Sequence, residues 1–244
     1  MKKQIIYLMT LATITLATSC KDGISSDSST QMELHKKVYK ASTDIGDLPT
    51  AINSLRYMIA IDSTNPNLLD TLANLYISVG QMQQAIKICD QYAVKYPLTE
   101  KVMETKELSF EKLDMLDSAY AMADKLFLKT EKLKYVYRQG YYKIQMGDKK
   151  GFDYLQKVID FKQPIKDSTE MRFGSGRNSY IQMVPIKAAA YFIKGSTLGL
   201  MHKYTETKEN YKLALKEFPE FYYVEQILQH FEQYVSDMES PPKR

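Results

Sequence analysis

The stretch from Leu68 to Pro97 reads LLDTLANLYISVGQMQQAIKICDQYAVKYP, and it decides the fold of the chain. Apolar residues recur in it at intervals of three and four on both sides of Gly80, which is typical of two amphipathic helices joined by a turn. The predicted inward positions are Leu69, Leu72, Ala73, Tyr76, Ala85, Cys89 and Tyr92. Pro97 ends the second helix. Because one hairpin of this size cannot bury its apolar face alone, the stretch predicts further copies stacked beside it.

Such copies follow at a period of 34 residues. Ala85 has counterparts at Ala51 and Ala119, each 34 residues away, and Gly80 has a counterpart at Gly46. A fourth copy departs from the pattern, because Gln139 falls where an apolar residue is expected. A turn shortened by one residue would bring the apolar face of that copy back into phase. The last copy carries Tyr191, Gly195, Leu198, Tyr211, Ala214 and Pro219.

These positions resemble those of the tetratricopeptide repeat (TPR) family, whose 34-residue repeat is a helix-turn-helix hairpin. The resemblance covers residues 32–221 and implies an all-α fold, a right-handed α-solenoid of about five TPR repeats.

After Pro219, residues 222–238 place Val224, Ile227, Leu228 and Phe231 on one face. This pattern predicts a C-terminal capping helix over the last repeat, because solenoids cover their final apolar face. Residues 239–244 are expected to be a disordered tail.

The first residues are expected to direct the chain to a bacterial membrane. Lys2 and Lys3 precede an apolar run, and small residues then lead to Cys20, so residues 1–19 are typical of a signal peptide. A cysteine in that place resembles the lipidated residue of bacterial lipoproteins. We therefore expect a lipid on Cys20, a flexible tether over residues 20–31, and a location at the cell envelope, with the outer membrane favoured because Lys21 is not an aspartate. A plain secretory signal is the alternative.

The charge balance argues against nucleic acid as a partner. The chain has 33 Lys and Arg against 29 Asp and Glu, a formal net charge of +4, and no strongly basic segment. Nucleic-acid-binding domains concentrate basic residues on one face. Besides Cys20 the only cysteine is Cys89, so a disulfide within the mature chain is not expected.

No catalytic, metal or cofactor site is expected from the sequence, and no small-molecule substrate. The three histidines, His35, His202 and His230, lie far apart, and none has a second ligand at metal-binding spacing. Carboxylates at helical spacing, such as Glu107 and Glu111, are interpreted as a solvated helix face. We therefore expect a binding protein rather than an enzyme.

An insertion of residues 165–185 interrupts the repeat rhythm and contains MRFGSGRNSY from Met171. Gly174 and Gly176 predict a loop, and the spacing matches neither phosphate-binding glycine motif. The insertion is interpreted either as a tolerated surface excursion or, preferably, as a partner-contact loop. Its candidate contact residues are Arg172, Phe173 and Arg177, because arginine and aromatic residues are common at interface hot spots.

The TPR resemblance also implies a groove lined by the first helix of each hairpin. Carried onto this sequence, the family's usual contact places give Lys36, Lys40, Asn74, Lys101, Arg138, Tyr142 and Phe192 as candidate partner-binding residues. The carboxylate clamp of the chaperone-binding members is not expected, because Lys40 and Thr71 stand where that clamp has asparagine. The expected function is a protein-binding scaffold of the envelope. The alternative is a structural subunit of an outer-membrane assembly or secretion machine, similar to the TPR lipoprotein of the β-barrel assembly complex.

Overall fold

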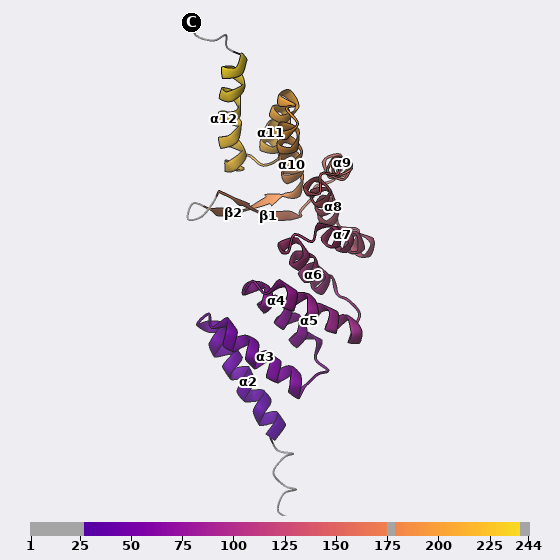
Figure 1. The fold of residues 1–244 in the computed structure, drawn as a ribbon, viewed down its shortest axis with the longest axis vertical. Coiled ribbons are helices and arrows are strands. Elements are labelled where there is room, and N and C mark those ends of the chain that lie inside the picture. Colours follow the sequence, from indigo (N-terminus) through magenta and orange to yellow (C-terminus); the bar gives the residue numbers. More distant parts are fainter. Residues whose placement is uncertain (1–26, 175–178, 240–244) are drawn as a thin grey trace, which may run out of the picture. The chain divides into compact units, whose positions relative to one another are not determined.

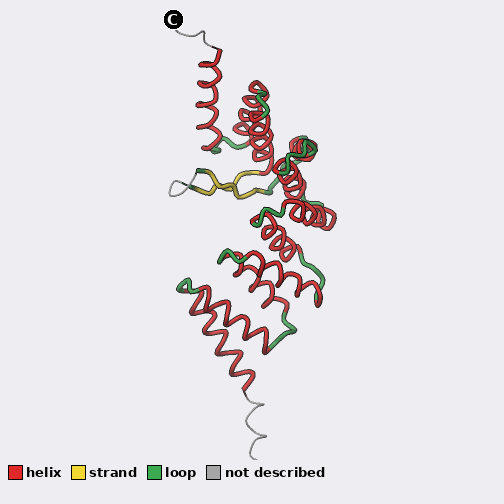
Figure 2. The backbone as a smooth tube through the Cα atoms, in the orientation of Figure 1, coloured by secondary structure: helices red, strands yellow, loops and turns green. Residues whose placement is uncertain are grey.

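The computed structural model describes residues 27–174 and 179–239, and in this part of the chain helical hairpins predominate (Figures 1 and 2). The chain divides into two compact units, unit 1 (Met1–Leu98) and unit 2 (Thr99–Arg244). Cys20, the expected signal peptide and residues 240–244 of the expected tail lie outside the described residues. The first residue of that tail, Glu239, is helical, so the tail prediction is wrong there. No helix of the described part is both long and apolar enough to cross a membrane.

Unit 1 consists of two antiparallel helical hairpins. Its helices are α2 (Asp27–Asp44), α3 (Leu48–Ile61), α4 (Pro66–Ser78) and α5 (Met82–Lys95). Their core joins Ile52, Leu55 and Met58 of α3 to Leu72 and Tyr76 of α4. Since α2 begins at Asp27, the expected flexible tether over residues 20–31 is wrong for its last five residues, which are helical.

Unit 2 contains three further hairpins, a small sheet and a last helix. Its helices are α6 (Glu100–Lys112), α7 (Leu116–Thr130), α8 (Leu133–Gln145), α9 (Gly151–Ile159), α10 (Ile186–Leu200), α11 (Tyr204–Glu217) and α12 (Tyr222–Glu239). The strands β1 (Ser168–Phe173) and β2 (Tyr180–Pro185) lie between α9 and α10. Helix α12 occupies the range of the predicted capping helix and contributes Val224 and Leu228 to the core of this unit.

Local signals in the sequence explain where the hairpins begin and turn. The side chains of Asp47, Asn65 and Thr99 accept backbone N–H bonds at the starts of α3, α4 and α6, and so cap these helices. Each hairpin turns through one residue with positive φ: Gly46, Gly80, Asp114, Gly147 and His202. The first three are 34 residues apart and Gly147 follows after 33, so the fourth first helix is shifted back by one residue as expected. The expected shortening of its turn is wrong, however: residues 146–150 between α8 and α9 outnumber those of the earlier turns, and the connection that is shorter is residues 131–132 between α7 and α8.

The insertion forms a β-hairpin, and the predicted loop is therefore wrong. Strand β1 pairs antiparallel with β2, with Ser168 opposite Pro185 and Phe173 opposite Tyr180. Alternate side chains of the hairpin point inward, and Phe173 and Val184 join the core of unit 2. The hairpin is stable here because one of its faces packs on helices; an isolated two-stranded sheet is marginal in water.

Two glycines allow α8 and α9 to pack at very short distance. A Cβ atom added to Gly151 would lie 2.7 Å from the carbonyl oxygen of Gly140 and 2.9 Å from the backbone nitrogen of Ile144. Real Cβ atoms do not approach backbone atoms so closely, so a side chain at residue 151 would push the two helices apart.

We therefore expect Gly151→Ala to destabilise unit 2 by about 1–3 kcal/mol, the usual cost of overpacking. The matched control is Gly199→Ala in α10, where the added Cβ would meet only Thr207 at an ordinary 3.5 Å. The control should be neutral or slightly stabilising, because alanine favours helix over glycine. Chemical denaturation of the two variants measures the difference, and equal stabilities would contradict the expectation.

Candidate partner-binding surface

The predicted contact residues of unit 1 lie on its first helices. Lys36 and Lys40 are exposed on α2, one helical turn apart, and the Lys36 ammonium is 3.9 Å from a carboxylate oxygen of Glu33. Asn74 is half-buried on α4, where its amide donates to the backbone oxygen of Asp70 at 2.8 Å and lies 3.1 Å from that residue's carboxylate. All three remain predictions as contact residues.

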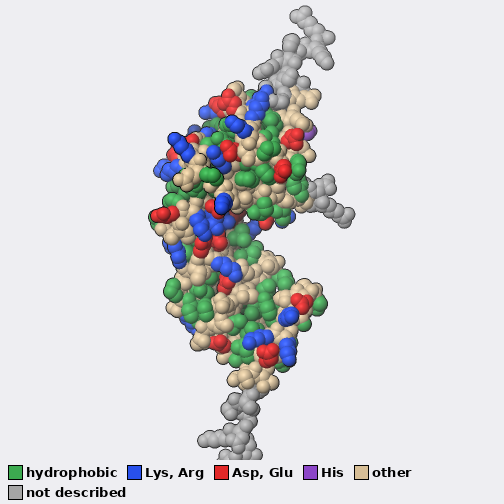
Figure 3. All heavy atoms as spheres, turned by 180° about the vertical axis from the view of Figure 1, so that it is seen from behind, with side chains coloured by type: hydrophobic (Ala, Val, Ile, Leu, Met, Phe, Trp, Pro, Cys, Tyr) green, Lys and Arg blue, Asp and Glu red, His purple; other side chains and the backbone are tan. Residues whose placement is uncertain are grey.

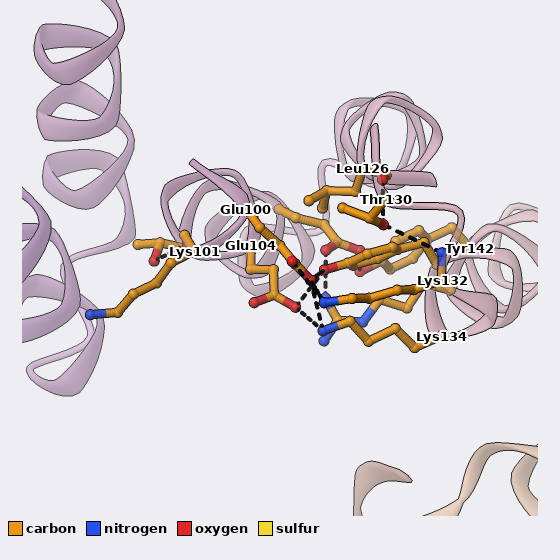
Figure 4. A network of polar contacts seen from close by, with 12 residues as sticks. Glu100, Lys101, Glu104, Leu126, Thr130, Lys132, Lys134 and Tyr142 are labelled. Carbon is orange, nitrogen blue, oxygen red and sulfur yellow. Dashed lines mark hydrogen bonds and ion pairs between the residues drawn. The ribbon is translucent and has the colours of Figure 1, made fainter. Parts of the chain in front are cut away.

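In unit 2 a polar network joins α6 to α8 (Figure 4). Lys132 contacts both carboxylate oxygens of Glu100 at 2.8 Å, and Lys134 contacts Glu104 at 2.8 Å. The Tyr135 hydroxyl lies between these two carboxylates, 2.5 Å from Glu100 and 2.9 Å from Glu104. Such a set of charge-assisted bonds fixes the spacing of two neighbouring first helices.

Glu107 is the buried member of this network, and its interpretation as part of a solvated face is wrong. Its side chain has no exposed surface, and it pairs with the Arg138 guanidinium. The hydroxyl of Tyr142 lies 3.0 Å from Glu107 and 2.9 Å from Glu111. Burial raises the pKa of Glu107, although the bonds from Arg138 and Tyr142 favour its charged form.

The fourth hairpin shows why two of the predicted contact residues are misplaced. Tyr142 has no exposed surface, and Arg138 is held by Glu107, so Tyr142 is not a surface contact and Arg138 is engaged within the protein. Because the turn of this hairpin falls at Gly147, the family's contact places move back by one residue, to Tyr137 and Tyr141. Tyr137 is buried, and Tyr141 is half-buried and packs against the core cluster of Ala119, Ala123 and Tyr142, so neither residue replaces Tyr142 as a surface candidate.

An aromatic cluster accounts for two further corrections. Phe173 of β1 is 5 % exposed and Phe192 of α10 is 9 % exposed, so neither side chain is available as a surface contact. The ring of Phe173 stacks on that of Tyr223 at a centroid distance of 4.4 Å and lies 6.0 Å from that of Phe192. Phe221 contacts both Phe173 and Phe192, at 5.6 Å and 5.5 Å. The insertion and the start of α12 therefore cover the side of α10 on which Phe192 lies.

Lys101 on α6 and Arg172 on β1 are exposed and stay predicted contact residues, whereas Arg177 lies outside the described residues. Figure 3 shows one face of the molecule, on which acidic and basic side chains are interspersed. Within the described residues no group of three or more His, Cys, Asp or Glu side chains is placed to hold a metal ion.

The network has a direct consequence for acid stability. Hydrogen bonds from Lys132, then from Tyr135, lower the pKa of Glu100 from 4.5 to about 2. A carboxyl group whose pKa is lower in the folded state stabilises that state above its unfolded pKa and loses this contribution as the pH falls. The contribution of Glu100 should therefore disappear between pH 4.5 and about pH 2.

Glu100→Gln tests this expectation. The variant should be less stable than the parent at neutral pH, and the two free energies of unfolding should converge as the pH falls toward 2. Urea denaturation across this pH range is the measurement, with Glu209→Gln on the exposed side of α11 as the control. A constant difference between Glu100→Gln and the parent at every pH would contradict the role given to Glu100.

Comparisons with known proteins place the fold. No protein-family model matches the sequence, and no curated protein matches it. Among solved structures, MamA is 16 % identical, with a TM-score of 0.58 over 77 % of this chain and 91 % of that chain. A TPR protein from Parabacteroides merdae is 15 % identical, with a TM-score of 0.60 over 88 % of this chain and 82 % of that chain.

A third similar structure is YrrB, described as a TPR protein with an unusual peptide-binding site. It is 11 % identical, with a TM-score of 0.55 over 78 % of this chain and 88 % of that chain. At such low identities a likeness establishes the fold and nothing finer. The predicted all-α class and the predicted TPR-type hairpins are confirmed.

Proposed function

We propose, from the TPR fold of this chain, that it is a protein-binding scaffold attached to the bacterial cell envelope through a lipid on Cys20. Its first helices would hold a segment of a partner protein. The observation that carries this proposal is the set of TPR hairpins found in each unit, since proteins of this fold use the surfaces that their stacked hairpins create to bind partners.

The network between α6 and α8 supports a preformed surface. Because Lys132, Lys134 and Arg138 are engaged by carboxylates of α6, the two helices are held at a fixed spacing before any partner arrives. A rigid surface loses little conformational freedom on binding, and so retains more of its contact energy as affinity. Lys101 in unit 2 and Lys36 and Lys40 in unit 1 would favour acidic groups on the partner.

The envelope location is supported by the sequence alone. The charged start, the apolar run and the small residues before Cys20 resemble a lipoprotein signal. Several acyl chains would hold the protein durably at a membrane surface. The parent chain should incorporate labelled palmitate in cells, and replacing Cys20 with serine should abolish this incorporation. Incorporation into both chains, or into neither, would contradict lipid attachment at this residue.

Photo-crosslinking in cells tests partner binding. A photoreactive residue at Lys101, exposed on the first helix α6, should capture a discrete protein. The same residue at Asp153, exposed on the second helix α9, is the matched control and should not capture it. Capture at both positions, or at neither, would contradict binding along the first helices. Recovery of an outer-membrane assembly subunit would favour the alternative function as part of such a machine.

A further inference from the structure

The β-hairpin of unit 2 has one edge with a complete set of outward backbone groups. The N–H of Ile186 donates to the carbonyl of Asp167 at 3.1 Å, which fixes the phase of the ladder between β1 and β2. In an antiparallel ladder every second residue pair exchanges these bonds, so Thr169, Met171 and Phe173 face β2. The backbone groups of Ser168, Glu170 and Arg172 consequently point away from it.

The other edge of the hairpin is less suited to pairing. Because the same residue pairs exchange hydrogen bonds, the backbone groups of β2 that point away from β1 belong to Ile181, Met183 and Pro185. Proline has no N–H to donate. On the β1 edge, Ser168, Glu170 and Arg172 are all exposed. Within the described ranges, no backbone bond from another element reaches these three residues. An edge of this kind is a template for a further strand.

Glu170 and Arg172 give this edge a charge pattern. They are two residues apart, so both side chains lie on the same, outer face of the sheet. Among the described residues neither carries an ion pair. Read along the strand, the pattern is acid, apolar, base: Glu170, Met171, Arg172.

We propose that β1 pairs with β1 of a second copy of this chain, antiparallel and with a twofold axis at Met171. This register places Glu170 of one copy opposite Arg172 of the other, twice. Both residues have outward backbone groups. The register therefore lets the two strands exchange backbone hydrogen bonds at the same residues whose charges pair. If the register slipped by one residue, the outward backbone groups of one copy would face residues of the other copy whose backbone groups already bond to β2. Glu170 and Arg172 would then no longer lie opposite each other.

The size of the contact sets its strength. Two six-residue strands bury far less than the roughly 1,200 Å² of a standard stable interface, so the dimer should be weak and dependent on concentration. The closed twofold symmetry limits the association to pairs, because each edge is used once. This inference does not depend on the groove-binding function proposed above.

Charge reversal tests the pairing. The background is the full chain with Cys20→Ser, which removes the thiol at residue 20. In a sedimentation concentration series, this chain should move from the 28.2 kDa monomer toward twice that mass.

Glu170→Arg and Arg172→Glu should each abolish the association, because each opposes like charges twice. An equimolar mixture of these two variants should associate again, and so should the double variant. Glu209→Arg on α11 is the control and should behave like the parent.

A cysteine pair tests the register. Glu170→Cys and Arg172→Cys chains with different tags should form a mixed disulfide when combined, since paired Cα atoms about 5.5 Å apart lie within disulfide reach. Each variant alone should crosslink poorly, and Cys89 will not compete because it is buried. A parent chain that stays monomeric with no mixed disulfide would overturn the proposal. So would single reversals that associate like the parent, or a mixture no more associated than its components.

Discussion

Replacing Arg138 with methionine should destabilise unit 2 by about 3–5 kcal/mol, the usual cost of removing one partner of a buried ion pair. Glu107, whose side chain has no exposed surface, would keep only its contact with the Tyr142 hydroxyl at 3.0 Å. It would then be either an uncompensated buried charge or a protonated acid. Hydrogen exchange of the α8 amides reports the loss locally, and denaturation reports it for the whole chain.

A double substitution distinguishes the loss of the ion pair between Glu107 and Arg138 from a simple loss of packing. Glu107→Leu combined with Arg138→Met removes both charges, and the Tyr142 hydroxyl retains its contact with Glu111 at 2.9 Å. The double variant should recover most of the lost stability, because apolar residues often replace a buried ion pair at little cost. Lys101→Met on the exposed side of α6 is the control. If Arg138→Met cost no more than Lys101→Met, the buried pair would have no structural importance.

The second large effect is expected at the insertion. Phe173→Ala should destabilise unit 2 by about 3–5 kcal/mol, because it removes a large buried ring from a packed cluster. The ring lies within 4.4–6.0 Å, centroid to centroid, of the rings of Tyr180, Phe192, Phe221 and Tyr223. Denaturation measures the loss, and increased hydrogen exchange in β1 and α10 would locate it.

The neighbouring residue provides the matched control. Arg172 is exposed on the opposite face of β1, and Arg172→Ala should change stability by no more than about 0.5 kcal/mol. Phe173→Leu should recover part of the loss, because an apolar side chain of similar size refills much of the space. Equal stabilities of Phe173→Ala and Arg172→Ala would show that the insertion is not part of the core.

The repeat architecture could be predicted because it depends on spacing. Ala51, Ala85 and Ala119 recur at 34 residues, and in the structure all three are fully buried on second helices. The turns at Gly46 and Gly80 both have φ of +77°, the conformation that favours glycine at these places. Asp114 and His202 take the same role without glycine, so a search for glycine alone does not find those turns.

The wrong predictions of surface exposure have a different cause. Whether Phe192 and Tyr142 are exposed depends on what packs against them, and neither the β-hairpin nor the network of α6 and α8 follows from periodicity. The hairpin was difficult to predict because its strands lack a clean apolar–polar alternation: Thr169 and Gln182 lie on the inward face, whereas the apolar residues Ile181 and Met183 are exposed. For Glu107 a signal did exist in the sequence. It stands in the place of Ala73 one repeat earlier, where small residues pack between helices, and a carboxylate there must be buried and paired.

The position of the β-hairpin in the chain has a consequence for how such proteins can diversify. It is inserted between two helical hairpins, so α10 and α11 keep their own pairing despite the extra residues. Segments added at such junctions can be gained without disturbing the modules on either side. This segment cannot be removed as a separate module, however, because Phe173 packs on Phe192, Phe221 and Tyr223, and a deletion would leave those rings in water. A shortened chain that restores the regular repeat spacing should therefore fold less well than the parent, although its helical hairpins would be complete.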